Sequence, residues 1–282
     1  MDRVPYEQIT HIPLEISEAM VPTCQLVIFL NPARIYYLLI APSGEVVLCR
    51  EYVNTERFSL EMFLRFVLEK DKLLSSPFLS CQICFSTPLF LLCPQAYWND
   101  RHKSFMAKLA LSDQLEEKEV AYSESRSLDV NIIFALKEGI THPLNRYVRY
   151  YTVSHVGLLM AEAAVAASRQ QAIISVLIMS DHVLICAANR GQLKLCNSYV
   201  HRSDSDIVYF IQTVREATGL TDRSIPVTVM GELGSRIVRE GGIWEFLPEV
   251  NIPDSASPFF VSQIAGTPWW KYAFLTLTKT GL

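Results

Sequence analysis

Two cysteines separated by two residues, Cys81 and Cys84, form the clearest chemical motif in the sequence. Such a pair can hold zinc or carry out redox chemistry. However, the sequence contains no second Cys or His pair at zinc spacing. The surrounding residues SCQICF predict a β-strand, in which residues three apart point to opposite faces. We therefore interpret both cysteines as structural thiols.

Other residues capable of chemistry are not arranged in a known catalytic pattern. The six histidines lack the paired spacing of a metal site, and the sequence has no Gly-x-Ser-x-Gly elbow and no P-loop. We therefore expect no catalytic residue, no metal and no cofactor.

Residues 146–151 alternate basic and aromatic side chains, which suits a partner groove or an amphipathic edge strand. Trp269 and Trp270 suit either a core or an interface.

The composition is that of an ordered globular protein. Half of the 282 residues are apolar, 19% are charged and the net charge is −4. Lys and Arg are scattered, which argues against nucleic acid as a partner. No secretory signal is readable. The most apolar windows, 25–42 and 172–188, are interrupted by Asn31, Pro32 and Arg34 and by residues 180–182, so neither gives the roughly 18 uninterrupted apolar residues of a membrane helix. We expect a soluble, cytoplasmic protein with reduced cysteines.

The chain repeats itself at an offset of about 147 residues. Residues 43–53 (SGEVVLCREYV) align without a gap on residues 190–200 (RGQLKLCNSYV). The matched positions include a hairpin glycine, a strand cysteine and a helix phenylalanine: Gly44 with Gly191, Cys49 with Cys196, and Phe63 with Phe210. We predict that residues 26–86 and 173–233 are copies of one unit, with both phenylalanines in the core under the sheet.

Each unit predicts three antiparallel strands, a helix and a fourth strand. In the first unit the strands are 25–30, 35–41 and 45–53, followed by a helix over 59–74 and a strand over 79–85. Because a helical crossover joins parallel strands, the fourth strand lies parallel to its partner. The second unit repeats this order: strands 172–179, 182–188 and 192–200, helix 205–219 and strand 227–233.

The remaining segments predict a link between two domains. Between the units, residues 87–100 predict a strand that leads into a loop, and residues 130–136 predict a buried strand. An Ala-rich helix over 155–168 has small side chains that allow close packing, so we interpret it as the connector. We predict an N-terminal domain over 1–153 and a C-terminal domain over 154–282.

This order of elements, given twice, resembles the duplicated ribonuclease-H-like fold of the actin, sugar kinase and heat-shock ATPase superfamily. Four segments make the chain similar to a narrower group: residues 91–100 (LLCPQAYWND), 127–136 (SLDVNIIFAL), Ser154-His155 and 268–277 (PWWKYAFLTL). That group is an uncharacterised bacterial family, a domain of unknown function with an actin-like ATPase fold. The likeness covers nearly the whole chain and implies a mixed α/β protein with two tandem ribonuclease-H-like domains.

The resemblance also implies where a nucleotide would bind. In working ATPases of the superfamily, a Gly-rich hairpin between the first two strands of each half cradles phosphate, and an Asp holds the water shell of the metal. Here these hairpins read LNPARI (30–35) and IMSDHV (178–183), without glycine. Pro32 removes a donor, and Asp181 is the one acidic residue in either hairpin. The first strands carry no carboxylates, so the two-metal site of a ribonuclease H nuclease is not expected.

We therefore predict a non-catalytic actin-like scaffold that binds a protein partner or a small ligand between its domains. The candidate site comprises the two hairpins and the turn after the last strand of the second unit: Asn31, Arg34, Ser180, Asp181, Gly231, Gly234 and Ser235. A closed, packed cleft is the alternative at this place. Two other functions stay open: a divergent ATPase that holds a nucleotide through Asp181, Gly231 and Gly234, and a pilus- or secretion-type assembly adaptor.

Overall fold

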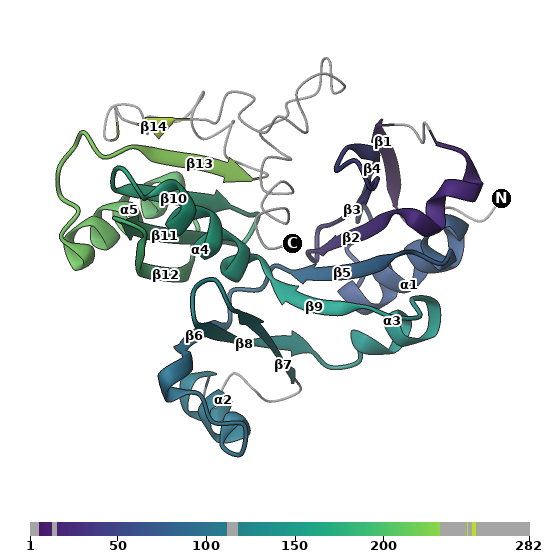
Figure 1. The fold of residues 1–282 in the computed structure, drawn as a ribbon, viewed down its shortest axis with the longest axis horizontal. Helices are drawn as coiled ribbons and strands as arrows, with labels where there is room; N and C mark the ends of the chain where they lie inside the picture. Colours follow the sequence, from purple (N-terminus) through teal and green to yellow (C-terminus); the bar gives the residue numbers. More distant parts are fainter. Residues whose placement is uncertain (1–5, 13–15, 112–117, 232–246, 248–249, 252–282) are drawn as a thin grey trace.

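Three β-sheets make up this computed structural model, which describes residues 6–12, 16–111, 118–231, 247 and 250–251. The sheets have six, five and three strands. Figure 1 shows the two larger sheets beside one another, the helix α4 (Val156–Ala167) next to the five-stranded sheet, and the smallest sheet beneath them. None of the helices in the described ranges has the length and apolar character needed to span a membrane.

The six-stranded sheet has the order β1-β4-β3-β2-β5-β9. Its strands are β1 (Glu7–Ile12), β2 (Gln25–Leu30), β3 (Arg34–Ile40), β4 (Val46–Val53), β5 (Ser80–Phe85) and β9 (Thr152–His155). Strands β2, β3 and β4 form the predicted antiparallel meander. Gly44 has a φ of 84° in the turn between β3 and β4, where a side chain would strain the backbone. Helix α1 (Leu60–Lys70) then leads to β5, which pairs parallel to β2.

The five-stranded sheet has the order β12-β11-β10-β13-β14. Its strands are β10 (Ile173–Ile178), β11 (His182–Asn189), β12 (Gln192–Val200), β13 (Val227–Gly231) and β14 (Val250–Asn251). Strands β10 to β12 are antiparallel, helix α5 (Asp204–Thr218) follows, and β13 pairs parallel to β10. Gly191, with a φ of 72°, forms the turn between β11 and β12 as Gly44 does in the first sheet.

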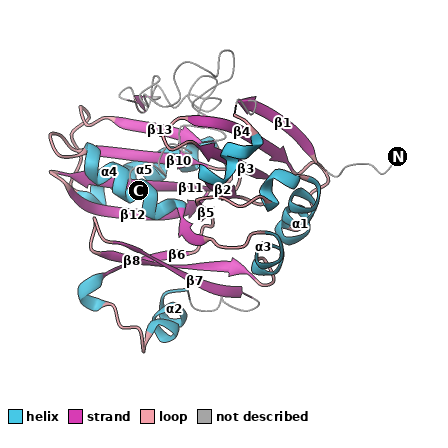
Figure 2. Cartoon of the chain, turned by 45° about the vertical axis from the view of Figure 1, so that its right-hand side comes forward, coloured by secondary structure: helices cyan, strands magenta, loops and turns pink. Residues whose placement is uncertain are grey.

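The three-stranded sheet, with the order β6-β8-β7, is inserted between β5 and β9 in the chain. It consists of β6 (Phe90–Pro94), β7 (Lys118–Ser125) and β8 (Val130–Lys137), all antiparallel. Helix α2 (Lys103–Leu111) packs Ala107 and Leu111 against Ile133 and Ala135. Figure 2 shows α2 on the side of this sheet that faces away from the five-stranded sheet.

Helices α1 and α5 begin where the sequence predicts, and α5 also ends there, whereas α1 ends at Lys70 and not at the predicted residue 74. Ser59 accepts a hydrogen bond from the Met62 N–H at the start of α1. Ser203 and Asp206 form a capping box at the start of α5, and Gly219 ends that helix in the left-handed conformation. Local sequence signals therefore determine where these helices lie along the chain.

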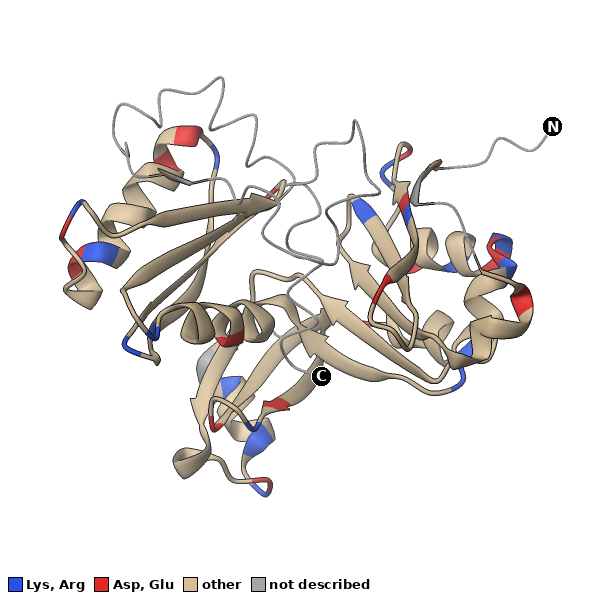
Figure 3. Cartoon of the chain, turned by 45° about the horizontal axis from the view of Figure 1, so that its top comes forward, with Lys and Arg blue, Asp and Glu red and all other residues tan. Residues whose placement is uncertain are grey.

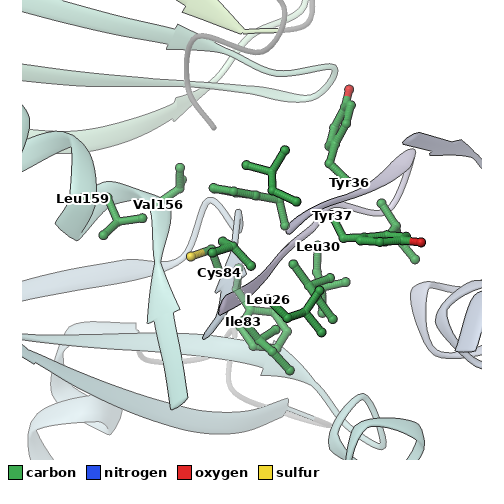
Figure 4. Close-up of a cluster of buried hydrophobic side chains, with 14 of the residues drawn as sticks. Leu26, Leu30, Tyr36, Tyr37, Ile83, Cys84, Val156 and Leu159 are labelled. Atoms are coloured by element: carbon green, nitrogen blue, oxygen red, sulfur yellow. The ribbon is translucent and has the colours of Figure 1, made fainter. Parts of the chain in front are cut away.

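The hydrophobic core runs continuously from the first sheet into the second. Figure 4 shows Val156 and Leu159 of α4 to the left of Cys84 of β5. One buried cluster contains these three residues together with Leu184 of β11. A second cluster lies on the other face of the second sheet, where Ile207, Ile211 and Val214 of α5 pack. Strand β10, which is apolar except for Ser175, is therefore buried on both faces.

Strands β7, β9 and β14 and helix α3 (Thr141–Tyr147) were not predicted. Strands β7 and β9 add to the third and first sheets, and α3 contacts α1. The proposed edge strand at 146–151 is wrong, because its first two residues end α3 and the next four contain no strand before Thr152. Trp269 and Trp270 lie outside the described residues.

The prediction that Phe63 and Phe210 have equivalent core positions needs correction. Phe63 is fully buried, whereas Phe210 is half-buried and stacks on Tyr199 with the ring centroids 4.6 Å apart. The core stripe of α5 consists of Ile207, Ile211 and Val214, at spacings of four and three residues. Phe210 lies at the edge of that stripe, because one residue corresponds to about 100° of helical rotation.

We expect Phe63→Ala to lower the free energy of unfolding by about 3–5 kcal/mol, because it empties a closed core site. Phe210→Ala should cost about 1–2 kcal/mol, since part of its ring already contacts water. Urea unfolding of the two variants beside the unmodified protein measures both values. Equal losses would show that the two phenylalanines are buried to the same extent.

Candidate functional site

The candidate site lies where the ends of strands from the two large sheets meet. Strands β2 and β5 of the first sheet end beside β10 and β11 of the second, and Ser86 Oγ lies 3.4 Å from His182 Nε2 across the junction. In α/β folds the carboxyl ends of parallel strands are where ligands bind. We call this region, formed by residues 31–34, 86–87, 155 and 179–182, the junction.

The turn between β2 and β3 uses its own hydrogen-bond donors. The Asn31 N–H donates to the Arg34 carbonyl at 3.0 Å, and the Arg34 N–H donates back to the Asn31 carbonyl at 3.1 Å. The Ala33 N–H donates to Asn31 Oδ1 at 2.8 Å. Pro32 has no N–H. Every backbone donor between residues 31 and 34 is therefore absent or occupied, and none points to an external anion.

The turn between β10 and β11 holds its acidic residue in a similar way. Asp181 Oδ1 lies 2.7 Å from Nδ1 of His182, a side chain that is 1% exposed. The hydrogen bond from His182 lowers the pKa of Asp181 below its ordinary value. On the other side of the ring, Nε2 faces Ser86 Oγ. Asp181 therefore orients a buried histidine, while Ser180 beside it is exposed.

A small cavity lies inside the junction. Its lining comes from both large sheets and α4: Phe29, Leu30, Asn31, Tyr36, Ser86, Val156, Leu177 and Met179. The volume of about 10 Å³ is that of roughly one water molecule. Asn31 is 3% exposed, and its Nδ2 has no hydrogen-bond partner within the described chain. Among the described residues, the interior of the junction is thus closed, with one unused buried donor.

Arg34 and Gly231 have structural partners outside this cavity. Arg34 donates to Glu51, a carboxylate that is 1% exposed, so its charge neutralises a buried acid in β4. Gly231 has a φ of 102°, and a Cβ there would lie 2.4 Å from the Ile178 carbonyl oxygen. The close pairing of β10 and β13 therefore requires this glycine. Gly234 and Ser235 lie outside the described residues.

His155 connects the junction to α4. Its Nδ1 accepts from the Gly157 N–H at 3.0 Å and caps the helix, which leaves the ring proton on Nε2, 3.0 Å from the Thr87 carbonyl oxygen. The side chain is fully buried, and this burial lowers the pKa of His155 to about 3. The imidazole is therefore neutral at physiological pH.

Sequence reasoning did not place Ser86, His155 or His182 in the candidate site. Ser86 and His182 are 96 residues apart, and no spacing pattern relates them.

Within the described residues, no group of three or more His, Cys, Asp or Glu side chains could hold a metal ion. Figure 3 shows Lys and Arg interspersed with Asp and Glu over the described part of the fold.

The strand order of the two large sheets defines the class of protein. The chain is similar to a solved protein of Bacteroides thetaiotaomicron described as having an actin-like ATPase fold and unknown function, with 19% identity, 84% of this chain and 93% of that chain covered, and a TM-score of 0.75. This likeness shows that the chain has the actin-like ATPase fold. It belongs to the family described as "Protein of unknown function (DUF3822)", which matches residues 16–238.

Two other solved structures share the fold at lower similarity. One is the ethanolamine utilization protein EutJ from Carboxydothermus hydrogenoformans, with 13% identity, 90% and 92% of the two chains covered and a TM-score of 0.50. The other is the PilM-PilN type IV pilus biogenesis complex, with 9% identity, 82% and 88% covered and a TM-score of 0.52. No curated protein matches the sequence.

We expect His155 to make the free energy of unfolding depend on pH. The unfolded chain binds a proton near the ordinary pKa of 6.5, whereas the folded chain binds it near pH 3. The stability that the neutral His155 contributes is therefore fully present above pH 6.5 and decreases as the pH drops toward 3. Between pH 7.5 and 5.0 this residue should account for a loss of about 2 kcal/mol.

The measurement is urea unfolding at both pH values. The control variant is His155→Asn, which keeps an acceptor for the start of α4 but does not titrate. Its stability should decrease by about 2 kcal/mol less than that of the unmodified protein over the same interval. The same pH dependence in both proteins would contradict a neutral buried imidazole at this position.

Proposed function

We propose that this chain is an actin-fold binding protein that recognises a protein partner or a small ligand at the junction and does not hydrolyse ATP. The observation that carries the proposal is the turn between β2 and β3, whose backbone donors are absent or already used within the turn. A phosphate group needs several free N–H groups directed at one point. Binding there would require these internal hydrogen bonds to break.

The second turn supports the same proposal. A metal-bound nucleotide needs a carboxylate that is free to hold the water shell of the metal. Asp181 instead accepts from His182, which in turn contacts Ser86 of the other sheet. The glycine at position 231 is required by the close approach of Ile178 rather than by a ligand. The residues thus serve the packing between and within the sheets.

We further propose that the two large sheets descend from one duplicated unit, with domains over 1–153 and 154–282 in a bacterial, cytoplasmic protein. The shared strand order and the matching turns at Gly44 and Gly191 support the duplication. In this proposal the exposed residues Ser180 and Asp181 form the recognition surface. Asn31 is buried, and its Nδ2 is a donor that is not used among the described residues.

An assembly adaptor is the second candidate function. The similarity to a solved type IV pilus biogenesis complex, at a TM-score of 0.52, supports it to the extent that the fold occurs in such a complex. A divergent ATPase is the third candidate, and it needs a nucleotide to reach Asp181 and Gly231. The divergent ATPase differs from the other two candidates in that a nucleotide binds at the junction.

We expect titration calorimetry to detect no binding of Mg-ATP at micromolar concentrations, because the first turn offers no free donors. Incubation with Mg-ATP should release no phosphate above the uncatalysed rate. Asp181→Ala is the matched variant, and it should behave like the unmodified protein toward Mg-ATP. A micromolar affinity that disappears in Asp181→Ala would instead establish the divergent ATPase.

A charge reversal on the exposed side of the junction tests partner recognition. We expect Ser180→Arg combined with Asp181→Lys to lose a binding partner that the unmodified protein captures from a lysate of its source cells. The control is Glu216→Lys, which changes an exposed charge on α5. Arg34 stays unchanged, because its removal would leave Glu51 buried without its cation. If the folded junction variant captures the same partner as the control, recognition takes place elsewhere.

A further inference from the structure

Two thiols face each other across the pairing of β11 and β12. Cys186 and Cys196 are directly opposite in the antiparallel register. Cys186 Sγ donates to Cys196 Sγ at 2.7 Å, and Cys196 Sγ donates to the Gly157 carbonyl oxygen at 3.4 Å. The two sulfur atoms therefore form a hydrogen-bonded chain that ends on the first turn of α4. We call this pair the dithiol.

The backbone around the dithiol already suits a disulfide. Residues directly opposite each other in an antiparallel pair have Cα atoms about 4.5–5.5 Å apart. Disulfides form between residues whose Cα atoms are about 4.4–6.8 Å apart. The two sulfur atoms are within contact distance. Small side-chain rotations are therefore sufficient to form the bond, without movement of the strands.

Cys196 is the thiol that a small molecule can reach. It is partly exposed and lines a groove of about 760 Å³ between β12 and the edge strand β6. Cys186 is 0% exposed, and burial raises its pKa. Since the thiolate is the attacking species, the partly exposed Cys196 is suited to react first and the buried Cys186 to react second.

The first sheet lacks a matching pair. Cys49, which matches Cys196 in the repeat, lies opposite Leu38 in the pairing of β3 and β4. It is fully buried, and burial raises its pKa. All seven cysteines of the chain are described, and all are free thiols. The dithiol thus belongs to the second sheet, and Cys49 provides an internal control in an equivalent strand.

We propose that Cys186 and Cys196 form a thiol–disulfide exchange site whose substrate is a low-molecular-weight disulfide such as oxidised glutathione. The Cys196 thiolate attacks one sulfur of that disulfide, which forms a mixed disulfide and releases one glutathione thiolate. The Cys186 thiolate then attacks the Cys196 sulfur and releases the second glutathione. The protein dithiol loses two electrons and two protons, and the glutathione disulfide gains them as two thiols.

Oxidation changes the contacts of the second sheet with α4. The disulfide has no S–H groups, so the hydrogen bond from Cys196 to Gly157 is lost. The bond also links β12, the edge strand, covalently to β11. The exchange site is separate from the junction residues of the proposed function. Either proposal can fail without the other.

The test treats the folded, fully reduced protein with oxidised glutathione and counts free thiols after denaturation. We expect the chain to lose two of its seven thiols. Peptide mapping should link Cys186 to Cys196, and a nonreducing gel should show no dimer. Cys49→Ser should give the same loss of two thiols. In Cys186→Ala the reaction should stop at one glutathione adduct on Cys196, and Cys196→Ser should show no linkage.

Circular dichroism establishes that each variant is folded before the assay. If a substitution at Cys186 unfolds the chain, alkylation kinetics of the unmodified protein replace it, and Cys196 should then react with iodoacetamide before Cys186 does. Retention of all seven thiols in the folded protein overturns the proposal. Linkage of other cysteines, or an adduct that stays on Cys196 of the unmodified protein, overturns it as well.

Discussion

One neutral imidazole connects the parts of this fold at the point where α4 begins. His155 ends β9 of the first sheet, caps α4 through the Gly157 N–H and lies against the Thr87 carbonyl after β5. Its ring also packs on Phe90 of β6 and Phe134 of β8, at centroid distances of 4.7 and 5.2 Å. The inserted sheet, the first sheet and the connecting helix therefore share one buried side chain, and its charged form would be strongly disfavoured there.

The hydrogen bonds inside the turn between β2 and β3 explain why an actin-like fold need not bind a nucleotide. A donor that is used inside a turn is not available to a ligand, and a buried donor without a partner carries a cost. Asn31 combines both situations, because its Oδ1 closes the turn while its Nδ2 faces the junction without a partner among the described residues. This turn lies where the resemblance implies a phosphate-binding hairpin, and its backbone donors are used within the turn.

Much of the fold could be predicted from local signals, and much of the site could not. The strands of both units follow from apolar runs, and Ser59 and Gly219 mark helix ends because caps act within one turn. Strand β9 was missed because its four residues gain their stability from pairing with β5, far away in sequence. The contact of Ser86 with His182 depends on how two sheets pack, which no local pattern encodes.

Gly157 shows how closely these features are packed together. Its N–H bonds His155, and its carbonyl accepts from Cys196. A Cβ at this position would lie 3.0 Å from His155 Nδ1 and 3.1 Å from Phe90 Cζ, so a side chain would force the imidazole or the inserted sheet to move. One turn of α4 thus contacts the junction histidine on one side and the dithiol on the other. Because packed interiors transmit small displacements, a shift of this turn would be felt by both His155 and Cys196.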